Sequence, residues 1–178
     1  MRPTLRPIVP IVPIALGIAV ALQAASLAAH AAGTVQVAYV QPEQFTDAGA
    51  YPGGVEDTLG QLTRYFATLA SRHLPDGQAL RIEVLDIDLA GTLQPWLRGG
   101  QEVRLLRDRA DWPRIKLRYT LEATGQAPRT SEQQISDTAY MRHFDRLYGS
   151  ESLVYEKRML GRWFSAEFGA AGGKDRIN

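Results

Sequence analysis

The 178-residue sequence contains no cysteine. This absence excludes disulfides, thiolate nucleophiles and zinc sites with thiolate ligands. Histidine is scarce as well, at three residues, and neither a Gly-x-Ser-x-Gly elbow nor a His-Glu-x-x-His pair occurs. The local sequence therefore offers no catalytic machinery and predicts no cofactor, although a site assembled from distant residues stays open.

Long apolar runs are also missing, except near the N-terminus. There, Ile14–Leu22 is a short uncharged run that follows two arginines and precedes Ala29-His30-Ala31. This pattern is typical of a secretory signal and predicts a signal peptide over residues 1–31, cleaved after Ala31. A retained anchor is the alternative, but the run is well short of the ~20 residues that a spanning helix needs. We therefore expect a soluble periplasmic product that does not span the membrane.

Neither sign of charge dominates the sequence. It has 20 lysines and arginines against 19 acids, and residues 1–31 hold two of the arginines and none of the acids. The remaining 147 residues thus carry 18 basic and 19 acidic side chains, a net charge of −1 with histidine neutral. Nucleic-acid-binding domains are usually clearly basic, so we expect no nucleic acid partner.

The 147 residues that follow the predicted signal peptide have the length of one domain. We predict this domain over residues 32–168, with a disordered tail at 169–178.

The clearest structural signal is the alternation in Pro113–Glu122. Ile115, Leu117, Tyr119 and Leu121 share one face, while Arg114, Lys116, Arg118 and Thr120 share the other. Side chains alternate faces along a strand, so this segment is predicted to be a half-buried strand with a basic outer face.

The remaining elements follow from the same kind of pattern. We predict two amphipathic helices, one beginning near Val55 and ending at Leu74, the other capped by Ser150 and burying Trp163 opposite Leu117. Residues 138–148 are ambiguous. Further strands are expected at 34–40, 80–89, 102–107 and 129–136, with loops at 41–54 and 90–100.

These elements predict an α+β fold. A helical connection makes the first two strands parallel, and short loops make the later ones an antiparallel meander. The result is a two-layer sandwich: a mixed, mostly antiparallel sheet of about five strands with two helices on one face.

The second strand changes phase in its middle. Leu80, Ile82 and Val84 share one face, but the apolar positions beyond them are Leu85, Ile87 and Leu89. Either a β-bulge lies near Val84-Leu85, which we favour, or both faces of the strand are covered. The bulge would send Asp86 and Asp88 to solvent.

The basic outer face of the strand predicted at Pro113–Glu122 is the first candidate site. Arg114, Lys116 and Arg118, with Arg104 and Arg81 as further members, could bind an anionic envelope component such as lipid, lipopolysaccharide or acidic polymer. The alternative is a solvated face on which Glu83 and Glu102 serve as cross-strand partners.

A second candidate is a strand-end site of Asp86, Asp88 and Trp96. The spacing Asp86-x-Asp88-x-x-Gly91 superficially resembles a calcium loop, but Ala90 and Leu97 stand where that loop needs oxygen ligands. The remaining chemistry here would be a hydrolase or metal-dependent enzyme that uses Asp86 and Asp88, and clustering of these with His143 would favour it.

Four segments together suggest a family. Val37–Asp47, Glu83–Gly91, Pro113–Leu121 and Tyr155–Phe164 resemble a family of exported bacterial proteins known only as a domain of unknown function. The resemblance spans nearly all of the chain after the signal and implies an exported single-domain protein of Gram-negative bacteria. It brings no activity, ligand or catalytic residue. We therefore predict a non-enzymatic binding or envelope-accessory module, whose partner is an anionic envelope component or another envelope protein.

Overall fold

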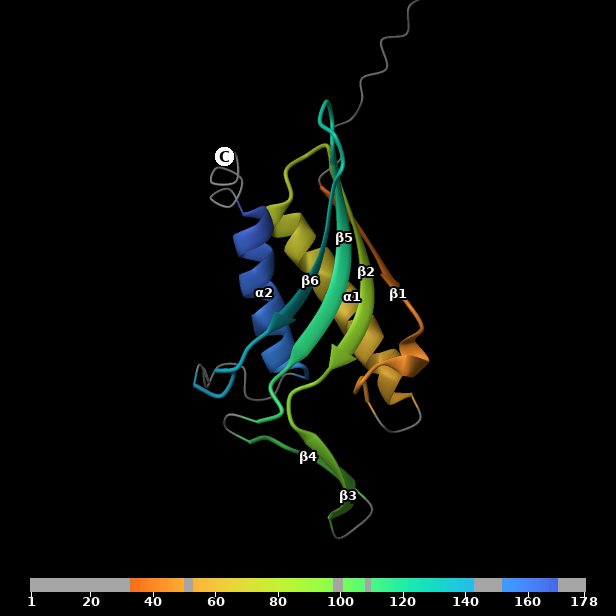
Figure 1. Ribbon diagram of the computed structural model, residues 1–178, viewed down its shortest axis with the longest axis vertical. Helices are drawn as coiled ribbons and strands as arrows, with labels where there is room; N and C mark the ends of the chain where they lie inside the picture. Colours follow the sequence, from red (N-terminus) through yellow and green to blue (C-terminus); the bar gives the residue numbers. More distant parts are fainter. Residues whose placement is uncertain (1–32, 50–52, 98–100, 108–109, 143–151, 170–178) are drawn as a thin grey trace, which may run out of the picture.

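The structure is a computed structural model that describes residues 33–49, 53–97, 101–107, 110–142 and 152–169, with the backbone alone at 95–97 and 101–103. Two helices cover one face of a curved sheet, and a thin hairpin extends beyond the end of the sheet (Figure 1). In chain order the elements are β1 (Thr34–Tyr39), η1 (Pro42–Gln44), α1 (Gly54–His73), β2 (Gln78–Asp88), β3 (Thr92–Leu97), β4 (Gln101–Leu105), β5 (Arg114–Ala123), β6 (Arg129–Ser136) and α2 (Val154–Phe168).

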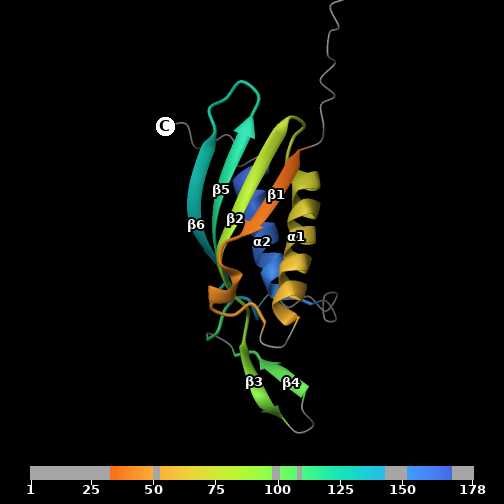
Figure 2. The same ribbon diagram turned by 90° about the vertical axis from the view of Figure 1, so that its right-hand side faces the viewer.

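The main sheet has the strand order β1-β2-β5-β6. β1 and β2 are parallel and are connected through α1, whereas β2–β5 and β5–β6 are antiparallel. Figure 2 shows both helices on the same side of this sheet. The predicted α+β architecture, a mixed sheet with two helices on one face, is confirmed.

One part of the predicted topology is wrong. The segment 90–100 was expected to be a loop and 102–107 a third strand of the meander, but β3 and β4 pair with each other and form a separate two-stranded sheet. β2 consequently pairs directly with β5, and the main sheet has four strands. The chain leaves the sheet at Gly91, whose φ of 82° is a left-handed conformation that glycine adopts readily.

The predicted bulge in β2 is confirmed. The register with β5 runs Val84↔Leu117 and then Asp86↔Lys116, so one residue of β2 is skipped between these pairs. Ile87 returns to the inner face and is fully buried. The bulge places Asp86 and Asp88 on the outer face.

The core lies between the sheet and the two helices. Each fully buried aliphatic or aromatic side chain contributes about 1.5–3 kcal/mol through removal of apolar surface from water. The helices and the two central strands all contribute large side chains of this kind: Leu62 and Phe66 of α1, Leu80, Ile82, Val84 and Ile87 of β2, Ile115, Leu117 and Tyr119 of β5, and Leu160 and Phe164 of α2.

Trp163 does not occupy the predicted place opposite Leu117. It is half-buried, and its ring centroid lies 6.1 Å from that of Tyr119, two residues further along β5. Its indole Nε1–H donates to Gln133 Oε1 at 2.8 Å. The polar edge of an indole needs such a partner, and this holds the ring at the margin of the core.

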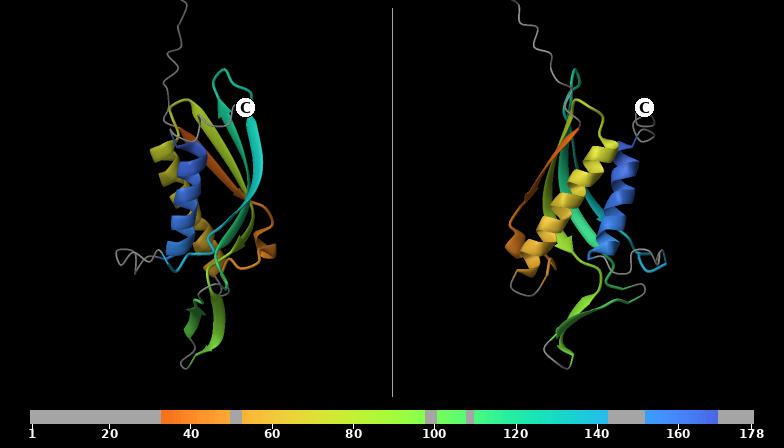
Figure 3. Two further views of the ribbon diagram at one scale, coloured as in Figure 1. Left: turned by 60° about the vertical axis from the view of Figure 1, so that its left-hand side comes forward. Right: turned by 180° about the vertical axis from the view of Figure 1, so that it is seen from behind.

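The two helices run in the same direction. Contacts between them advance together along both: Lys157 donates to Gln61 near their N-terminal ends, and Ser165 meets His73 near their C-terminal ends. Figure 3 shows them side by side over the sheet.

α2 begins at Val154, and the cap predicted at Ser150 lies outside the described residues. Among the described residues, no helix is long and apolar enough to cross a membrane.

Candidate binding groove and the charged sheet face

The basic row predicted on β5 is present on the outer face of the sheet, where every member contacts a carboxylate. Arg114 pairs with Asp88, and Lys116 Nζ lies 3.0 Å from Glu132 Oε1. Arg118 contacts Glu132 Oε2 at 2.8 Å and Glu83 Oε2 at 3.2 Å. An anion that bound to this row would have to compete with these carboxylates.

Charge on this face is close to balanced. Hydrogen bonds from Lys116 and Arg118 lower the pKa of Glu132, and the bond to Glu132 raises the pKa of Arg118. Charges of alternating sign on neighbouring strands are the usual pattern of a solvated antiparallel sheet. On β2, β5 and β6 the outward positions hold the acids Glu83, Asp86, Asp88, Glu122 and Glu132 and the bases Arg81, Arg114, Lys116 and Arg118.

Arg104 lies apart from the row. Its guanidinium forms a two-pronged pair with Asp47, with Nη1–Oδ2 at 2.7 Å and Nη2–Oδ1 at 3.1 Å. It also donates to the carbonyls of Ala90 and Gly91, at 3.3 and 2.9 Å. The buried carboxylate of Glu156 accepts from the Ala90 N–H at 2.7 Å. Together these contacts fasten the root of the β3–β4 hairpin to the main body.

The two aspartates of the predicted strand-end site, Asp86 and Asp88, are each held by a different partner. Asp86 accepts from the backbone N and Oγ1 of Thr46, at 2.7 and 2.9 Å, and Asp88 is bound by Arg114. Trp96 lies in β3, in the hairpin outside the main sheet, and His143 lies outside the described residues. Within the part of the chain that the structure describes, no three His, Cys, Asp or Glu side chains group so as to hold a metal ion.

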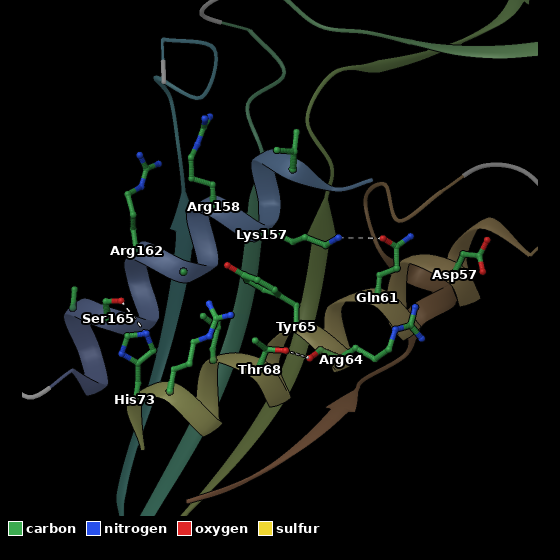
Figure 4. A pocket seen from close by; sticks show the side chains of 15 residues that line it. Asp57, Gln61, Arg64, Tyr65, Thr68, His73, Lys157, Arg158, Arg162 and Ser165 are labelled. Atoms are coloured by element: carbon green, nitrogen blue, oxygen red, sulfur yellow. Dashed lines mark hydrogen bonds between the residues drawn. The ribbon is translucent and has the colours of Figure 1, made fainter. Parts of the chain in front are cut away.

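A larger feature is a groove between α1 and α2, on the side of the helices that faces away from the sheet (Figure 4). Its volume of about 1320 Å³ exceeds the roughly 300–1,000 Å³ that is usual for small-molecule sites. Its polar lining residues are Asp57, Gln61, Arg64, Tyr65, Thr68, Arg72 and His73 of α1 and Lys157, Arg158, Arg162 and Ser165 of α2.

The lining is strongly cationic, with four arginines and one lysine against a single acid, Asp57. Arg162 pairs with Asp137, and Arg158 donates to the carbonyl of Tyr140, at the margin of the groove. Among the described residues, the Lys157 ammonium bonds to a neutral group, Gln61 Oε1, at 3.4 Å.

The guanidinium groups of two groove arginines, Arg64 and Arg72, have no hydrogen-bond or ion-pair partner among the described residues. Both are exposed. Arg64 runs along its own helix, with Nη1 3.4 Å from where a Cβ on Gly60 would stand. No described carboxylate contacts these two guanidinium groups or the Lys157 ammonium.

Gly161 shapes the middle of the groove. A Cβ at this position would stand 2.9 Å from the Tyr65 hydroxyl, closer than real Cβ contacts. The absence of a side chain on α2 therefore admits the tip of Tyr65 between the helices, and Figure 4 shows the ring pointing from α1 toward α2.

Sequence reasoning missed this groove, although a signal existed. Arg64, Thr68 and Arg72 recur at intervals of four residues, as do Lys157, Gly161 and Ser165, so each set forms a stripe on its helix. The predictions treated these helices as cover for the core. Only the parallel packing of α1 and α2 reveals that the two stripes face one groove.

A serine and a histidine meet where the groove reaches the C-terminal ends of α1 and α2. Ser165 Oγ lies 3.3 Å from His73 Nε2, and the imidazole packs against the ring of Phe164 at 5.8 Å. No carboxylate contact to this imidazole occurs among the described residues, and the serine lies within a helix, not at a strand-to-helix turn. The pair ties the two helix ends together and does not by itself indicate catalysis.

Comparison with known proteins agrees with the resemblance found in the sequence. Neither the curated proteins nor the solved structures contain a significant match to the chain. One family model matches residues 33–166, most of the chain and every element from β1 to the greater part of α2. The chain belongs to this family, described as protein of unknown function (DUF3016).

Proposed function

We propose that the chain is an exported, non-enzymatic binding protein whose ligand carries negative charge, and that the α1–α2 groove binds this ligand. The observation that carries the proposal is the charge of the groove lining: five cations against one carboxylate, with Arg64, Arg72 and Lys157 neutralised by no described acid. A concave surface with one sign of charge attracts ligands of the other sign and speeds their association.

The groove is a stronger candidate than the basic row on the sheet. An anion at Arg114, Lys116 and Arg118 must displace carboxylates that already hold hydrogen bonds to all three. An anion in the groove meets the guanidinium groups of Arg64 and Arg72, which contact no carboxylate among the described residues. The sheet row remains the competing surface in the experiment below.

Export is supported by the arrangement of the chain. The predicted signal peptide ends at Ala31, and both the first strand and the family match begin just after it, at residues 34 and 33. An anionic component of the envelope, or another envelope protein with an acidic surface, is the class of partner that an exported protein of this kind would meet.

Binding is tested with inorganic polyphosphate as the probe, by calorimetry at low and moderate salt. The groove variant combines Arg64→Gln, Arg72→Gln and Lys157→Gln. The matched sheet variant combines Arg114→Gln, Lys116→Gln and Arg118→Gln, which removes the same charge from the other face. We expect binding that weakens with salt, that is reduced at least tenfold in the groove variant, and that is nearly unchanged in the sheet variant.

Two results would overturn this proposal. If the unmodified protein does not bind polyphosphate at low salt, it is not an anion-binding module. If the sheet variant loses binding and the groove variant keeps it, the surface is wrong. Thermal unfolding of both variants shows whether either loss reflects misfolding.

Export has its own measurement. Mass spectrometry of the protein from a periplasmic fraction should give a chain that begins at Ala32. An intact N-terminus, or recovery only with membranes, would contradict the assignment of residues 1–31.

A further inference from the structure

The two groove arginines whose guanidinium groups have no partner among the described residues are separated along one helix. Arg64 and Arg72 are eight residues apart on α1, so their Cα atoms are about 12 Å apart along the helix axis at ~1.5 Å per residue. Thr68 lies midway on the same stripe. The groove therefore has two cationic positions that are separated along α1.

Between these two positions α1 contributes no charge: its lining residues there are Tyr65, Thr68 and Leu69. On α2, Gly161 stands opposite Tyr65, and the flanking Arg158 and Arg162 are bonded to the Tyr140 carbonyl and to Asp137 at the margin of the groove. A hydroxyl group donates and accepts hydrogen bonds, and an aromatic ring offers an apolar face with a polar tip. Sugar rings present the complementary chemistry, namely hydroxyl groups around the rim and an apolar face.

The chemistry of the end positions favours phosphate. A guanidinium presents a planar fork of N–H donors that matches two oxygens of one phosphate, and it keeps its charge at any physiological pH. At the Arg64 end the Lys157 side chain extends from α2 toward Gln61, as Figure 4 shows, and adds a second cation to that end.

Resting on the function proposed above, we propose that the groove binds a saccharide that carries two phosphate groups, one held near Arg64 and Lys157 and the other near Arg72, with the sugar over Tyr65 and Thr68. The groove volume of about 1320 Å³ accommodates a ligand of more than one sugar ring. Such a saccharide could be free or could be the head group of a glycolipid, and the recognition chemistry is the same in both cases.

The test compares three soluble probes by calorimetry on the full protein: a disaccharide with two terminal phosphates, the same disaccharide with one phosphate, and inorganic phosphate. We expect the doubly phosphorylated form to bind at least tenfold more tightly than either of the others. Arg64→Gln and Arg72→Gln should each reduce its affinity to that of the singly phosphorylated form, and Lys116→Gln on the sheet should leave it unchanged.

The outcomes separate this inference from the function on which it rests. Equal affinity for the singly and doubly phosphorylated sugars would overturn the two-ended site, while polyphosphate binding would still support an anion-binding groove. Binding to phosphatidylglycerol vesicles without binding to any soluble probe would show that the ligand is a membrane surface and would overturn the saccharide. Failure with polyphosphate as well would overturn both proposals.

Discussion

The Tyr119 hydroxyl donates a hydrogen bond to Glu167 Oε1 at 2.5 Å, between β5 and the last turn of α2. Both side chains are buried, with 1% and 7% of their residue surfaces exposed. Arg129 completes the arrangement: its Nη1 lies 3.0 Å from the same carboxylate oxygen. A phenol, a carboxylate and a guanidinium thus fasten the C-terminal end of α2 to the sheet.

This contact predicts a stability change in alkali. Burial, followed by the bond to Glu167, raises the pKa of Tyr119 to about 12 from its ordinary value near 10. The folded state therefore retains the proton more tightly than the unfolded state. The stabilisation is complete below pH 10 and is lost as the pH rises from about 10 to about 12.

The Tyr119→Phe variant measures that contribution. At neutral pH it should be less stable than the parent by about 1–3 kcal/mol, since the lost bond has a charged acceptor. In urea titrations the gap between variant and parent should shrink between pH 10 and 12. Tyr155→Phe is the control, because it also removes a tyrosine hydroxyl, but from a ring that packs on Tyr140 with the two ring centroids 5.0 Å apart. A gap for Tyr119→Phe that is constant across this range would contradict the prediction.

The buried Glu156 predicts a change of stability in acid. It is 3% exposed, and burial raises its pKa more than the Ala90 N–H bond and the charge of Arg104 lower it. Because the folded pKa is the higher one, this group's contribution to stability is complete below the unfolded pKa of about 4.3. The contribution is then lost as the pH rises through the folded pKa.

We therefore expect Glu156→Gln to be at least as stable as the parent at neutral pH. The amide oxygen can still accept the Ala90 N–H, and no charge needs to be buried. Below about pH 4 the difference in unfolding free energy should vanish. Glu132→Gln is the control of opposite sign, because Glu132 has a lowered pKa: its contribution is complete above its unfolded pKa and is lost as the pH falls through the folded pKa. A variant less stable than the parent at neutral pH but not in acid would contradict this reading of Glu156.

The features that could be predicted from the sequence are those that appear as a local periodicity of apolar residues. The bulge in β2 could be predicted because the apolar residues up to Val84 and those from Leu85 onward alternate out of phase. The register with β5 shifts at this point, between Val84 and Asp86. The alternation in β5 likewise gave the correct buried face, with Ile115, Leu117 and Tyr119 inside.

The features that could not be predicted depend on which segment meets which. Alternation in residues 102–107 indicates a strand but does not identify its partner, so the hairpin was placed in the main sheet. Glu156 and Glu167 look like solvated helix acids, because their partners Ala90 and Tyr119 lie 66 and 48 residues away. The cationic groove was missed for the same reason, since helical periodicity gives stripes on single helices and not their packing.

The root of the β3–β4 hairpin supplies a test of this unpredicted element. Gly91 has φ 82°, and a Cβ there would stand 2.5 Å from the Leu105 carbonyl oxygen. Gly125, in the β5–β6 turn, has φ 76° with nothing within 4 Å of a Cβ. Gly125→Ala should cost only the left-handed conformation, about 1–2 kcal/mol. Gly91→Ala should cost clearly more, because the hairpin backbone must also move.

The comparison of these two glycines by chemical denaturation isolates the close contact from the backbone conformation, which is nearly the same at both. Equal losses would show that the hairpin can shift away from Gly91 freely. In that case the contacts of Arg104 and Glu156 at the hairpin root would not hold it rigidly against the body.

The alternation of β5 is tested by two neighbouring residues. Leu117 is fully buried opposite Val84, so Leu117→Ala should reduce the free energy of unfolding by about 2–5 kcal/mol through lost burial and a residual cavity. Lys116 points to the outer face, where its ammonium lies 3.0 Å from Glu132 and both side chains are more than a third exposed. Exposed ion pairs contribute at most about 1 kcal/mol, so Lys116→Ala should cost less than that. Urea titration of the two variants should therefore give midpoints far apart. Similar midpoints would contradict the assignment of Leu117 to the buried face and Lys116 to the exposed face of β5.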